Sequence, residues 1–209
     1  MESQARRSVE INGSAIEICF AQGLSGLENP LLTAKLIPQE ELADLGGFFR
    51  RRGKRISFTT GVYDMIHIGH SRYLQMARDL AGQFGCLVTG LNSDKSVKAL
   101  KGPYRPILPE RQRAEMLSFL GFVDYISIYD GPNGAEIIKL LRPDVYLCVE
   151  GSWEGDIATK EEVKAMAEVG GSVYYTPRQE PSLSTTEIIS RIEGGVLQQF
   201  QEYVRKASR

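Results

Sequence analysis

From Arg55 onward, the chain alternates short runs of β-branched and aromatic residues with longer segments that have helical spacing. Tight turns cannot join parallel strands, because each connection must cross over the sheet and usually does so as a helix. The alternation therefore predicts an α/β fold, a Rossmann-like doubly wound sheet of five parallel strands in a domain of about 140 residues. The runs expected to form strands are RISFTT at 55–60, CLVTGL at 86–91, DYISIY at 124–129, DVYLCV at 144–149 and SVYYT at 172–176.

The segments between these runs, and the residues that punctuate them, favour helices. In the segment after the first run, Tyr73, Ala77 and Leu80 fall on one stripe. Pro109 stands at a favoured first helical position, and paired glycines suited to a C-cap close the last segment. The expected helices are HSRYLQMARDLA at 70–81, PERQRAEMLSFL at 109–120, GAEIIKLL at 134–141 and KEEVKAMAEVGG at 160–171.

The first part of the chain, residues 1–54, lacks this alternation. The run AIEICF at 15–20 is a strand candidate, and PQEELADLGGFFRRRGK at 38–54 favours a helix interrupted at Gly46 and Gly47. These residues are too few for a second catalytic domain. We interpret them as an appendage that packs on the core or on a partner subunit.

The last part of the chain, after Ile192, has the pattern of an amphipathic helix. Val196, Leu197 and Phe200 fall on one side of it, which favours packing or self-association, and we expect a homodimer. The predicted division is an N-terminal appendage at 1–54, a catalytic domain at 55–193 and a C-terminal helix at 194–209.

The balance of charge argues against a nucleic-acid or membrane partner. The chain has 25 Lys+Arg and 26 Asp+Glu, a formal net charge of −1, so no global field draws it to an anionic polymer or surface. The basic run RRRGKR at 50–55 has no interleaved aromatic residue, and we interpret it as a solvated linker. Any phosphate binding must therefore come from a local site.

The cysteines and the apolar runs predict a cytoplasmic protein. Cys19, Cys86 and Cys148 are far apart, odd in number and set in apolar runs, which is typical of reduced thiols in a core. No apolar run approaches the ~18 residues of a membrane span, and the N-terminus lacks the apolar part of a secretion signal.

Both histidines of the chain stand in one short stretch, DMIHIGH, directly after the first expected strand. His67 and His70 flank Gly69 where a helix is expected to begin, and helix N-termini bind phosphate through free N–H groups and the helix dipole. Two imidazoles there can donate to a polyphosphate and stabilise the charge that develops on phosphorus. Alternatives are a pair of packed structural residues, or a zinc site, for which no third or fourth ligand lies nearby.

These residues also carry a family resemblance. SFTTGVYDMIHIGHSRYLQMARDL resembles the opening of the HxGH nucleotidylyltransferase superfamily, and the resemblance continues through TGLNSDKSVKALKGPYRPILPERQRAEML, LRPDVYLCVEGSWEGD and LSTTEIISRI. The motif HIGH also occurs in class I aminoacyl-tRNA synthetases. The chain is too short for one and has no Lys-Met-Ser-Lys-Ser signature.

The resemblance implies a reaction and a set of site residues. Members transfer a nucleoside monophosphate from an NTP to a phosphorylated small molecule and release pyrophosphate, with Mg²⁺ held by phosphates and water rather than by a protein metal site. It implies that His67, His70, Lys101 and Arg113 are catalytic, and that the Gly- and Pro-rich stretch around Lys101 closes over the phosphates as a mobile loop. The residues that it places at the nucleotide are Thr60, Gly61, Val62, Tyr63, Gly69, Asn92, Asp94, Ser184, Thr185 and Thr186.

Part of the nucleotide set also has a structural interpretation. Ser184 and Glu187 fit the capping box S-x-x-E before an apolar helix, and a capped helix N-terminus can still bind an anion. Gly61 is expected to turn the backbone sharply after the first strand, and Gly69 to let it approach a ligand closely.

The substrates are divided between two branches of the superfamily. The stretch at 90–110 is most similar to heptose 1-phosphate adenylyltransferases, but Glu150 stands where that branch has lysine. The segments WEGD and STTEI resemble glycerol-3-phosphate cytidylyltransferases, but Gly121 stands where those enzymes have arginine. The candidate acceptor-binding residues are Asp64, Arg105, Glu150, Trp153 and Arg178.

We favour ATP with a sugar phosphate. The alternatives are a CTP-dependent enzyme acting on a phosphoalcohol, and a catalytically inactive module that senses nucleotides. Asp64 also has a structural interpretation, as a cap for its own loop.

Overall fold

The structure is a computed structural model of the 209-residue chain. It describes residues 6–11, 14–19, 29–150, 159–177 and 184–207. Contacts within the chain divide it into two compact units, Met1–Pro30 and Leu31–Arg209. The three-part division predicted from the sequence is therefore kept below only as a proposal.

The first unit contains a β-hairpin. Strand β1 (Arg6–Ile11) pairs antiparallel with β2 (Ser14–Cys19), with Arg6 opposite Cys19 and Ile11 opposite Ser14. Strand β2 matches the run AIEICF to within a residue at each end. Strand β1 had no counterpart in the sequence predictions.

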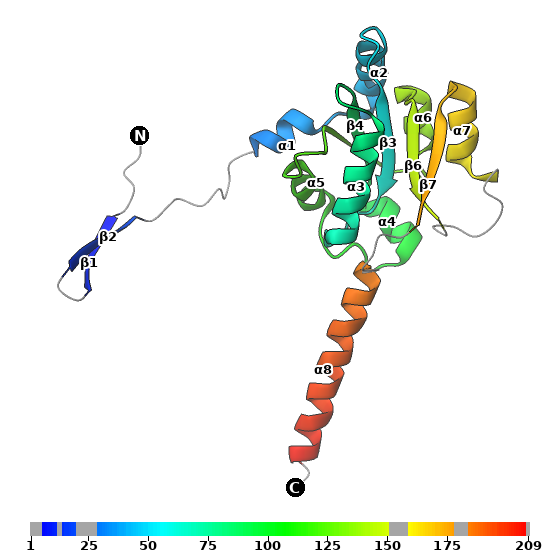
Figure 1. The fold of residues 1–209 in the computed structure, drawn as a ribbon. Helices are drawn as coiled ribbons and strands as arrows, with labels where there is room; N and C mark the ends of the chain where they lie inside the picture. Colours follow the sequence, from blue (N-terminus) through cyan, green and yellow to red (C-terminus); the bar gives the residue numbers. More distant parts are fainter. Residues whose placement is uncertain (1–5, 12–13, 20–28, 151–158, 178–183, 208–209) are drawn as a thin grey trace. The chain divides into compact units, whose positions relative to one another are not determined.

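The second unit is built on a five-stranded parallel sheet in the order β5-β4-β3-β6-β7, with helices on both faces (Figure 1). The predicted fold class is confirmed, and each strand lies within a residue or two of its predicted run. Strand β3 stands between β4 and β6, so the connections lead away from it in both directions. The bounds are β3 (Ile56–Gly61), β4 (Cys86–Asn92), β5 (Tyr125–Tyr129), β6 (Val145–Val149) and β7 (Ser172–Thr176).

The four predicted crossover helices are present, and the structure adds an unpredicted helix, α4, between β4 and α5. Helix α4 (Asp94–Lys101) ends where the stretch expected to be a loop begins, and its N-cap Ser93 accepts a hydrogen bond from Ser96 N at 3.1 Å. The predicted helices are α3 (Ile68–Leu80), α5 (Glu110–Ser118), α6 (Ala135–Leu141) and α7 (Glu161–Val169). Pro109 is the N-cap of α5, one residue earlier than expected.

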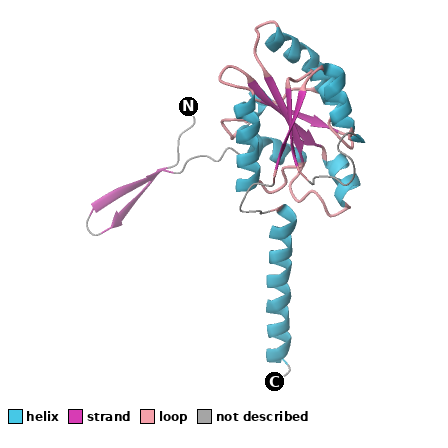
Figure 2. Cartoon of the chain, turned by 45° about the vertical axis from the view of Figure 1, so that its right-hand side comes forward, coloured by secondary structure: helices cyan, strands magenta, loops and turns pink. Residues whose placement is uncertain are grey.

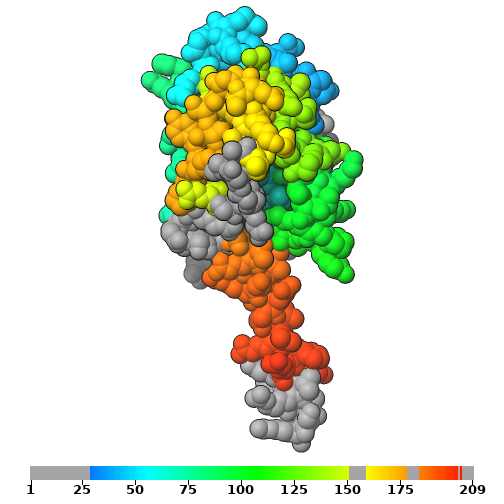
Figure 3. Space-filling model, turned by 90° about the vertical axis from the view of Figure 1, so that its right-hand side faces the viewer, coloured from blue at the N-terminus to red at the C-terminus, as the bar shows by residue number. Residues whose placement is uncertain are grey.

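Helices cover both faces of the sheet (Figure 2), and the core has two parts, one on each face. Against one face, Ile138 of α6 and Met166 of α7 pack on Phe58 and Tyr146. Against the other face, Leu74 of α3 and Leu117 of α5 pack on strand residues. Helices α6 and α7 lie on the side turned toward the viewer in Figure 3. A doubly wound sheet therefore separates α3 from α7.

Residues before the sheet also enter this core. Leu32 of α1 (Pro30–Lys35) is buried, as are Leu42 and Phe49 of α2 (Leu42–Arg50), which follows the short helix η1 (Gln39–Glu41). The part of the predicted appendage after residue 30 thus packs on the core.

The predicted interruption of a helix at Gly46 and Gly47 is wrong, because α2 is continuous through both. A Cβ at Gly46 would lie 2.2 Å from Leu141 O, and Arg50 Nη1 donates to the same oxygen at 2.8 Å. Glycine is required here for a close approach between α2 and the end of α6, not for a break.

The final helix, α8 (Thr185–Ala207), is also longer than predicted, because it begins at Thr185 and continues through Gly194 and Gly195. Val196, Leu197 and Phe200 are exposed on it, each by more than half. Among the described residues, no helix is long and apolar enough to cross a membrane. Cys86 and Cys148 are buried free thiols, as predicted.

Candidate active site

A cavity of about 1160 Å³ opens at the carboxyl ends of β3, β4 and β6. Ligands of open α/β sheets bind at this edge, where the strand order reverses and helix N-termini face outward. The sequence-predicted residues that line it come from five separate segments, and α8 contributes the last of them. They are Thr60, Gly61, Tyr63, His67, Gly69, His70, Asn92, Lys101, Ser184, Thr185 and Thr186.

The two histidines lie together at the start of α3. His67 is the N-cap residue and makes no side-chain cap bond, and His70 follows in the first turn. Their rings stack with centroids 3.9 Å apart and an angle of 26° between planes. Within the described residues, neither Nδ1 atom has a hydrogen-bond partner although both are buried. Both imidazoles therefore keep hydrogen-bonding capacity for a ligand.

Burial keeps both imidazoles neutral at pH 7. It lowers the pKa of His67, and it lowers the pKa of His70 to about 4, with further lowering by the charges of His67 and Lys101. Each ring then carries one N–H donor and no charge, which removes the repulsion between two stacked cations. An anion bound beside them would favour the protonated forms and raise both pKa values.

Tyr63 fixes one side of the histidine pair. Its ring meets His70 edge-on at 5.4 Å, and its backbone φ is 50°. A Cβ at Gly61 would lie 2.8 Å from Tyr63 Cζ. The sequence predicted a sharp turn at Gly61. In the structure, the absence of a Cβ at Gly61 leaves the space that the Tyr63 ring occupies.

The start of α8 is tied to the histidine loop. Thr185 Oγ1 donates to Asp64 O at 2.5 Å, and Thr185 is buried. Glu187 N donates to Ser184 Oγ at 3.1 Å, which is half of the predicted capping box. The other half is absent from the described contacts, because the Glu187 carboxylate accepts from Arg191 Nη2 at 2.7 Å. Thr186 is exposed, so its hydroxyl is better placed for a ligand than that of Thr185.

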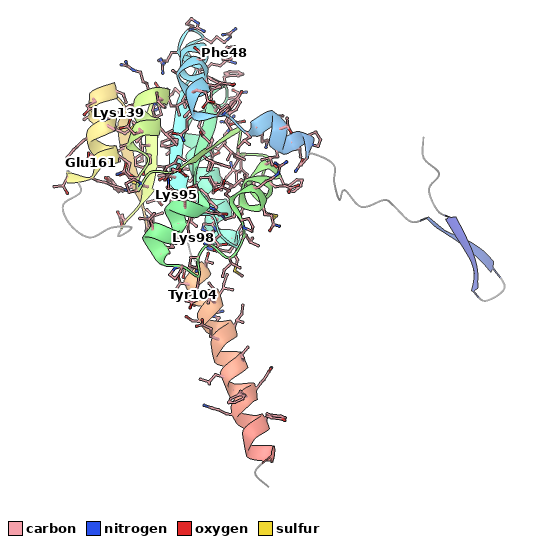
Figure 4. The ribbon with its side chains drawn as sticks, turned by 180° about the vertical axis from the view of Figure 1, so that it is seen from behind. Phe48, Lys95, Lys98, Tyr104, Lys139 and Glu161 are labelled. Atoms are coloured by element: carbon pink, nitrogen blue, oxygen red, sulfur yellow. The ribbon has the colours of Figure 1, made fainter. Side chains whose placement is uncertain are left out.

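Lys101 reaches the cavity from the last residue of α4. The same helix carries Lys95 and Lys98, which Figure 4 labels. The side chains that meet at the cavity can thus offer imidazole N–H groups, an ammonium group and hydroxyls to a polyphosphate.

A family comparison covers the whole set of residues that line the cavity. The family model described as cytidylyltransferase-like matches residues 58–191, and every lining residue lies within this range. The chain belongs to the cytidylyltransferase-like family. The predicted superfamily is thereby confirmed.

Curated relatives named bifunctional protein HldE align with the same region. The one from Syntrophotalea carbinolica is 39% identical over 159 residues, 76% of this chain and 31% of the relative. The one from Nitratiruptor sp. is 40% identical over 153 residues, which is 73% of this chain and 31% of the relative. The one from Campylobacter curvus is 46% identical over 111 residues, which is 53% of this chain and 23% of the relative. The chain spans less than a third of the length of these relatives.

In this cytidylyltransferase-like chain, Arg113 lies behind the cavity rather than in its lining. It is fully buried and donates to Leu108 O at 2.9 Å, to Val62 O at 2.6 Å and to Asp94 Oδ1 at 2.8 Å. The sequence predicted Arg113 as catalytic and Val62 and Asp94 as nucleotide-binding. In the structure Arg113 joins the other two by donating to each of them, and this fixes the loop before α3.

Two of the candidate acceptor residues pair with each other. Asp64 is buried and accepts from Ile107 N at 2.8 Å and Leu108 N at 3.0 Å, and Arg105 Nη2 lies 3.2 Å from its carboxylate. Asp64 therefore holds the 105–108 segment, which is a structural role but not the predicted one of a cap for its own loop. Glu150 is exposed and does not line the cavity, while Trp153 and Arg178 lie outside the described residues.

Sequence reasoning missed the cavity wall on the α6 and α7 side. Tyr129, Asn133, Tyr146, Lys160 and Glu162 line it. Tyr129 ends β5, and Asn133, Lys160 and Glu162 lie in the segments that follow β5 and β6, which was the available signal. Tyr146 is the second residue of β6 and carries no such signal. No motif joins them, because they come from three separate stretches of sequence.

Proposed function

We propose that the chain transfers a nucleoside monophosphate, with ATP favoured, to a sugar phosphate such as heptose 1-phosphate, and releases pyrophosphate. The observation that carries the proposal is the stacked pair of neutral imidazoles, His67 and His70, at the start of α3, with both Nδ1 atoms unbonded in the described part of the chain. The choice of ATP rests on the similarity of residues 90–110 to the adenylyltransferase branch and on the HldE relatives.

The proposed chemistry needs no general base from the protein. An oxygen of the acceptor phosphate, already an anion at neutral pH, attacks the α-phosphorus in line, and the bond from that phosphorus to the bridging oxygen of pyrophosphate breaks. His67 and His70 donate to the oxygens on which charge develops. Lys101 holds the pyrophosphate part as a compact cation.

We propose Mg²⁺ as the metal that accompanies the nucleotide. Among the described residues, no three His, Cys, Asp or Glu side chains form a cluster that could hold a metal. The proposal rests on the family resemblance, since Mg²⁺ commonly keeps several waters and is held chiefly by phosphate oxygens. When bound, it would neutralise phosphate charge.

Two residues that depart from the branch patterns, Gly121 and Glu150, lie outside the cavity lining and are therefore weaker arguments about the substrates. Gly121, which argued against a cytidylyltransferase, does not line the cavity, and a Cβ there would meet nothing within 4 Å. Glu150, which argued against heptose phosphate, is exposed and also outside the lining. The choice between ATP and CTP is therefore tested by measuring pyrophosphate release with each nucleotide.

The test is pyrophosphate release with four NTPs and a panel of sugar phosphates, glycerol 3-phosphate and phosphocholine. We expect the largest rate with ATP and a sugar 1-phosphate. A largest rate with CTP and glycerol 3-phosphate would select the alternative enzyme. Nucleotide binding with no release for any combination would select the sensing module.

We propose that the protein forms a homodimer through α8. Its apolar side chains Val196, Leu197 and Phe200 are each more than half exposed, and a second copy of the helix would bury them. Light scattering should report a dimer for the native chain and a monomer for Val196→Asp.

This arrangement keeps the predicted division of labour, with catalysis in 55–193, association in 194–209 and an appendage in 1–54. We also propose a cytoplasmic location, supported by the buried free thiols of Cys86 and Cys148.

A further inference from the structure

The wall of the cavity on the α6 and α7 side has a chemistry unlike that of the histidine side. The buried carboxylate of Glu162 lies close enough to two buried phenols, Tyr129 and Tyr146, for its charge to act on both. Asn133 and Lys160 line the same wall. The proposed phosphate chemistry uses none of these five residues.

Glu162 has hydrogen-bonding capacity that the described contacts leave unused. Its side chain is in the first turn of α7, and the residue is 5% exposed. In the described part of the chain its carboxylate accepts one hydrogen bond, a long one of 3.4 Å from Gly134 N. A carboxylate can accept about four, and a buried one is costly unless it is hydrogen-bonded. A ligand with several donors would complete it.

The two tyrosines stay protonated around this carboxylate. Burial raises the pKa of Tyr129 and of Tyr146, and the negative charge of Glu162 raises both further. The Tyr146 hydroxyl lies 3.3 Å from Thr60 Oγ1. The wall therefore offers neutral hydroxyls next to a carboxylate.

This combination suits a polyhydroxylated ligand. Hydroxyl groups donate to the carboxylate and exchange hydrogen bonds with Asn133 and the tyrosine hydroxyls. An alkylammonium group fits less well, because Lys160 Nζ already lies over the Tyr146 ring, 5.7 Å from its centroid. A phosphate group would be repelled by Glu162 and attracted to the side of His67.

We infer that this wall binds the hydroxyl groups of the acceptor and that Glu162 is its specificity-determining residue. The inference rests on the proposed function and deepens it, since it makes the acceptor a sugar or polyol phosphate rather than a phosphorylated amino alcohol. The acceptor then lies with its phosphate toward α3 and its hydroxyls toward α7.

The experiment compares native protein with Glu162→Gln, which keeps the shape and removes the charge. The control is Glu168→Gln, the same change at an exposed position of the same helix. We expect Glu162→Gln to lower kcat/KM for a sugar phosphate by about 10- to 100-fold, the size of a hydrogen bond to a charged group. The KM for the nucleotide should not change, and the loss should be smaller for glycerol 3-phosphate, which has fewer hydroxyls.

An unchanged KM for the sugar phosphate in Glu162→Gln, or a native preference for phosphocholine, would overturn the inference. If Glu162→Gln does not fold, Tyr146→Phe provides the same test by removing one hydroxyl, and we expect a loss of about 3- to 10-fold.

Failure of the proposed function can be distinguished from failure of the inference about the wall. If no pyrophosphate is released with any acceptor, calorimetry with the sugar phosphate alone still tests the wall. Binding to the native protein that weakens in Glu162→Gln supports it, and equal or absent binding in both overturns it.

Discussion

The two walls of the cavity differ in chemistry and in how they are encoded. The α3 side offers donors, with His67 and His70 in one short motif and Lys101 at the end of the next helix. The α7 side offers a carboxylate and phenols gathered from β5, β6 and α7. If the two proposals hold, the reaction class and the choice of acceptor are set by residues on separate elements.

The largest effect should come from removing the histidines. We expect His67→Ala and His70→Ala each to lower kcat by about 10²- to 10³-fold, because each removes a donor to the charge that develops on phosphate. Folding should be intact by thermal melting. Lys95→Ala is the surface control, since its side chain is 81% exposed and pairs with Asp130. Near-normal turnover in both histidine variants would contradict the proposal that His67 and His70 act in the chemical step.

The histidine wall could be predicted because its residues are contiguous. A strand, a glycine and two histidines at a helix start specify the site without knowledge of the rest of the fold. The strands were predicted for a similar reason, since buried parallel strands are short continuous apolar runs, and β4 is buried along its whole length.

The rest depends on tertiary contacts that no local pattern contains. The α7 wall exists only because the sheet order brings β5 and β6 to either side of β3 and β4. Gly46 looked like a helix breaker because its contact is with Leu141, 95 positions away in the numbering. Arg113 resembled a catalytic residue by position in the motif, and its burial and partners could not be deduced from spacing.

A second prediction concerns the support behind the histidine wall. Arg113→Met should lower the free energy of unfolding by about 3 kcal/mol, because it leaves two carbonyls and the partly exposed Asp94 carboxylate without their donor. Denaturant unfolding measures this change. Arg191→Ala, which breaks an exposed pair with Glu187, should change it by less than about 1 kcal/mol. Equal effects would mean that Arg113 does not brace the site.

A third prediction separates the adjacent threonines of α8. Thr185→Val should cost about 1 kcal/mol of stability, because it removes the hydrogen bond to Asp64 O. Thr186→Val should leave stability within about 0.5 kcal/mol, since that side chain is exposed, and should raise the KM for the nucleotide. The reverse pattern would exchange their roles.

A fourth and smaller effect is the titration of the histidines, which NMR can follow cleanly because the chain has only two. In the free protein, His70 should titrate at about 4 and His67 below its ordinary value of 6.5. The unfolded imidazole takes up a proton that folded His70 excludes, so this group should lower stability as pH falls from about 6.5 toward 4. A titration of His70 near 6.5 would contradict the burial of the pair.

The most direct test of the division between the walls is one matrix of pyrophosphate-release assays, in which native protein, His67→Ala and Glu162→Gln each meet a sugar 1-phosphate and glycerol 3-phosphate with the same NTP. We predict that His67→Ala lowers kcat by the same factor for both acceptors, whereas Glu162→Gln raises KM mainly for the sugar phosphate. A histidine variant that discriminates between acceptors, or a Glu162 variant that affects both equally, would contradict the account.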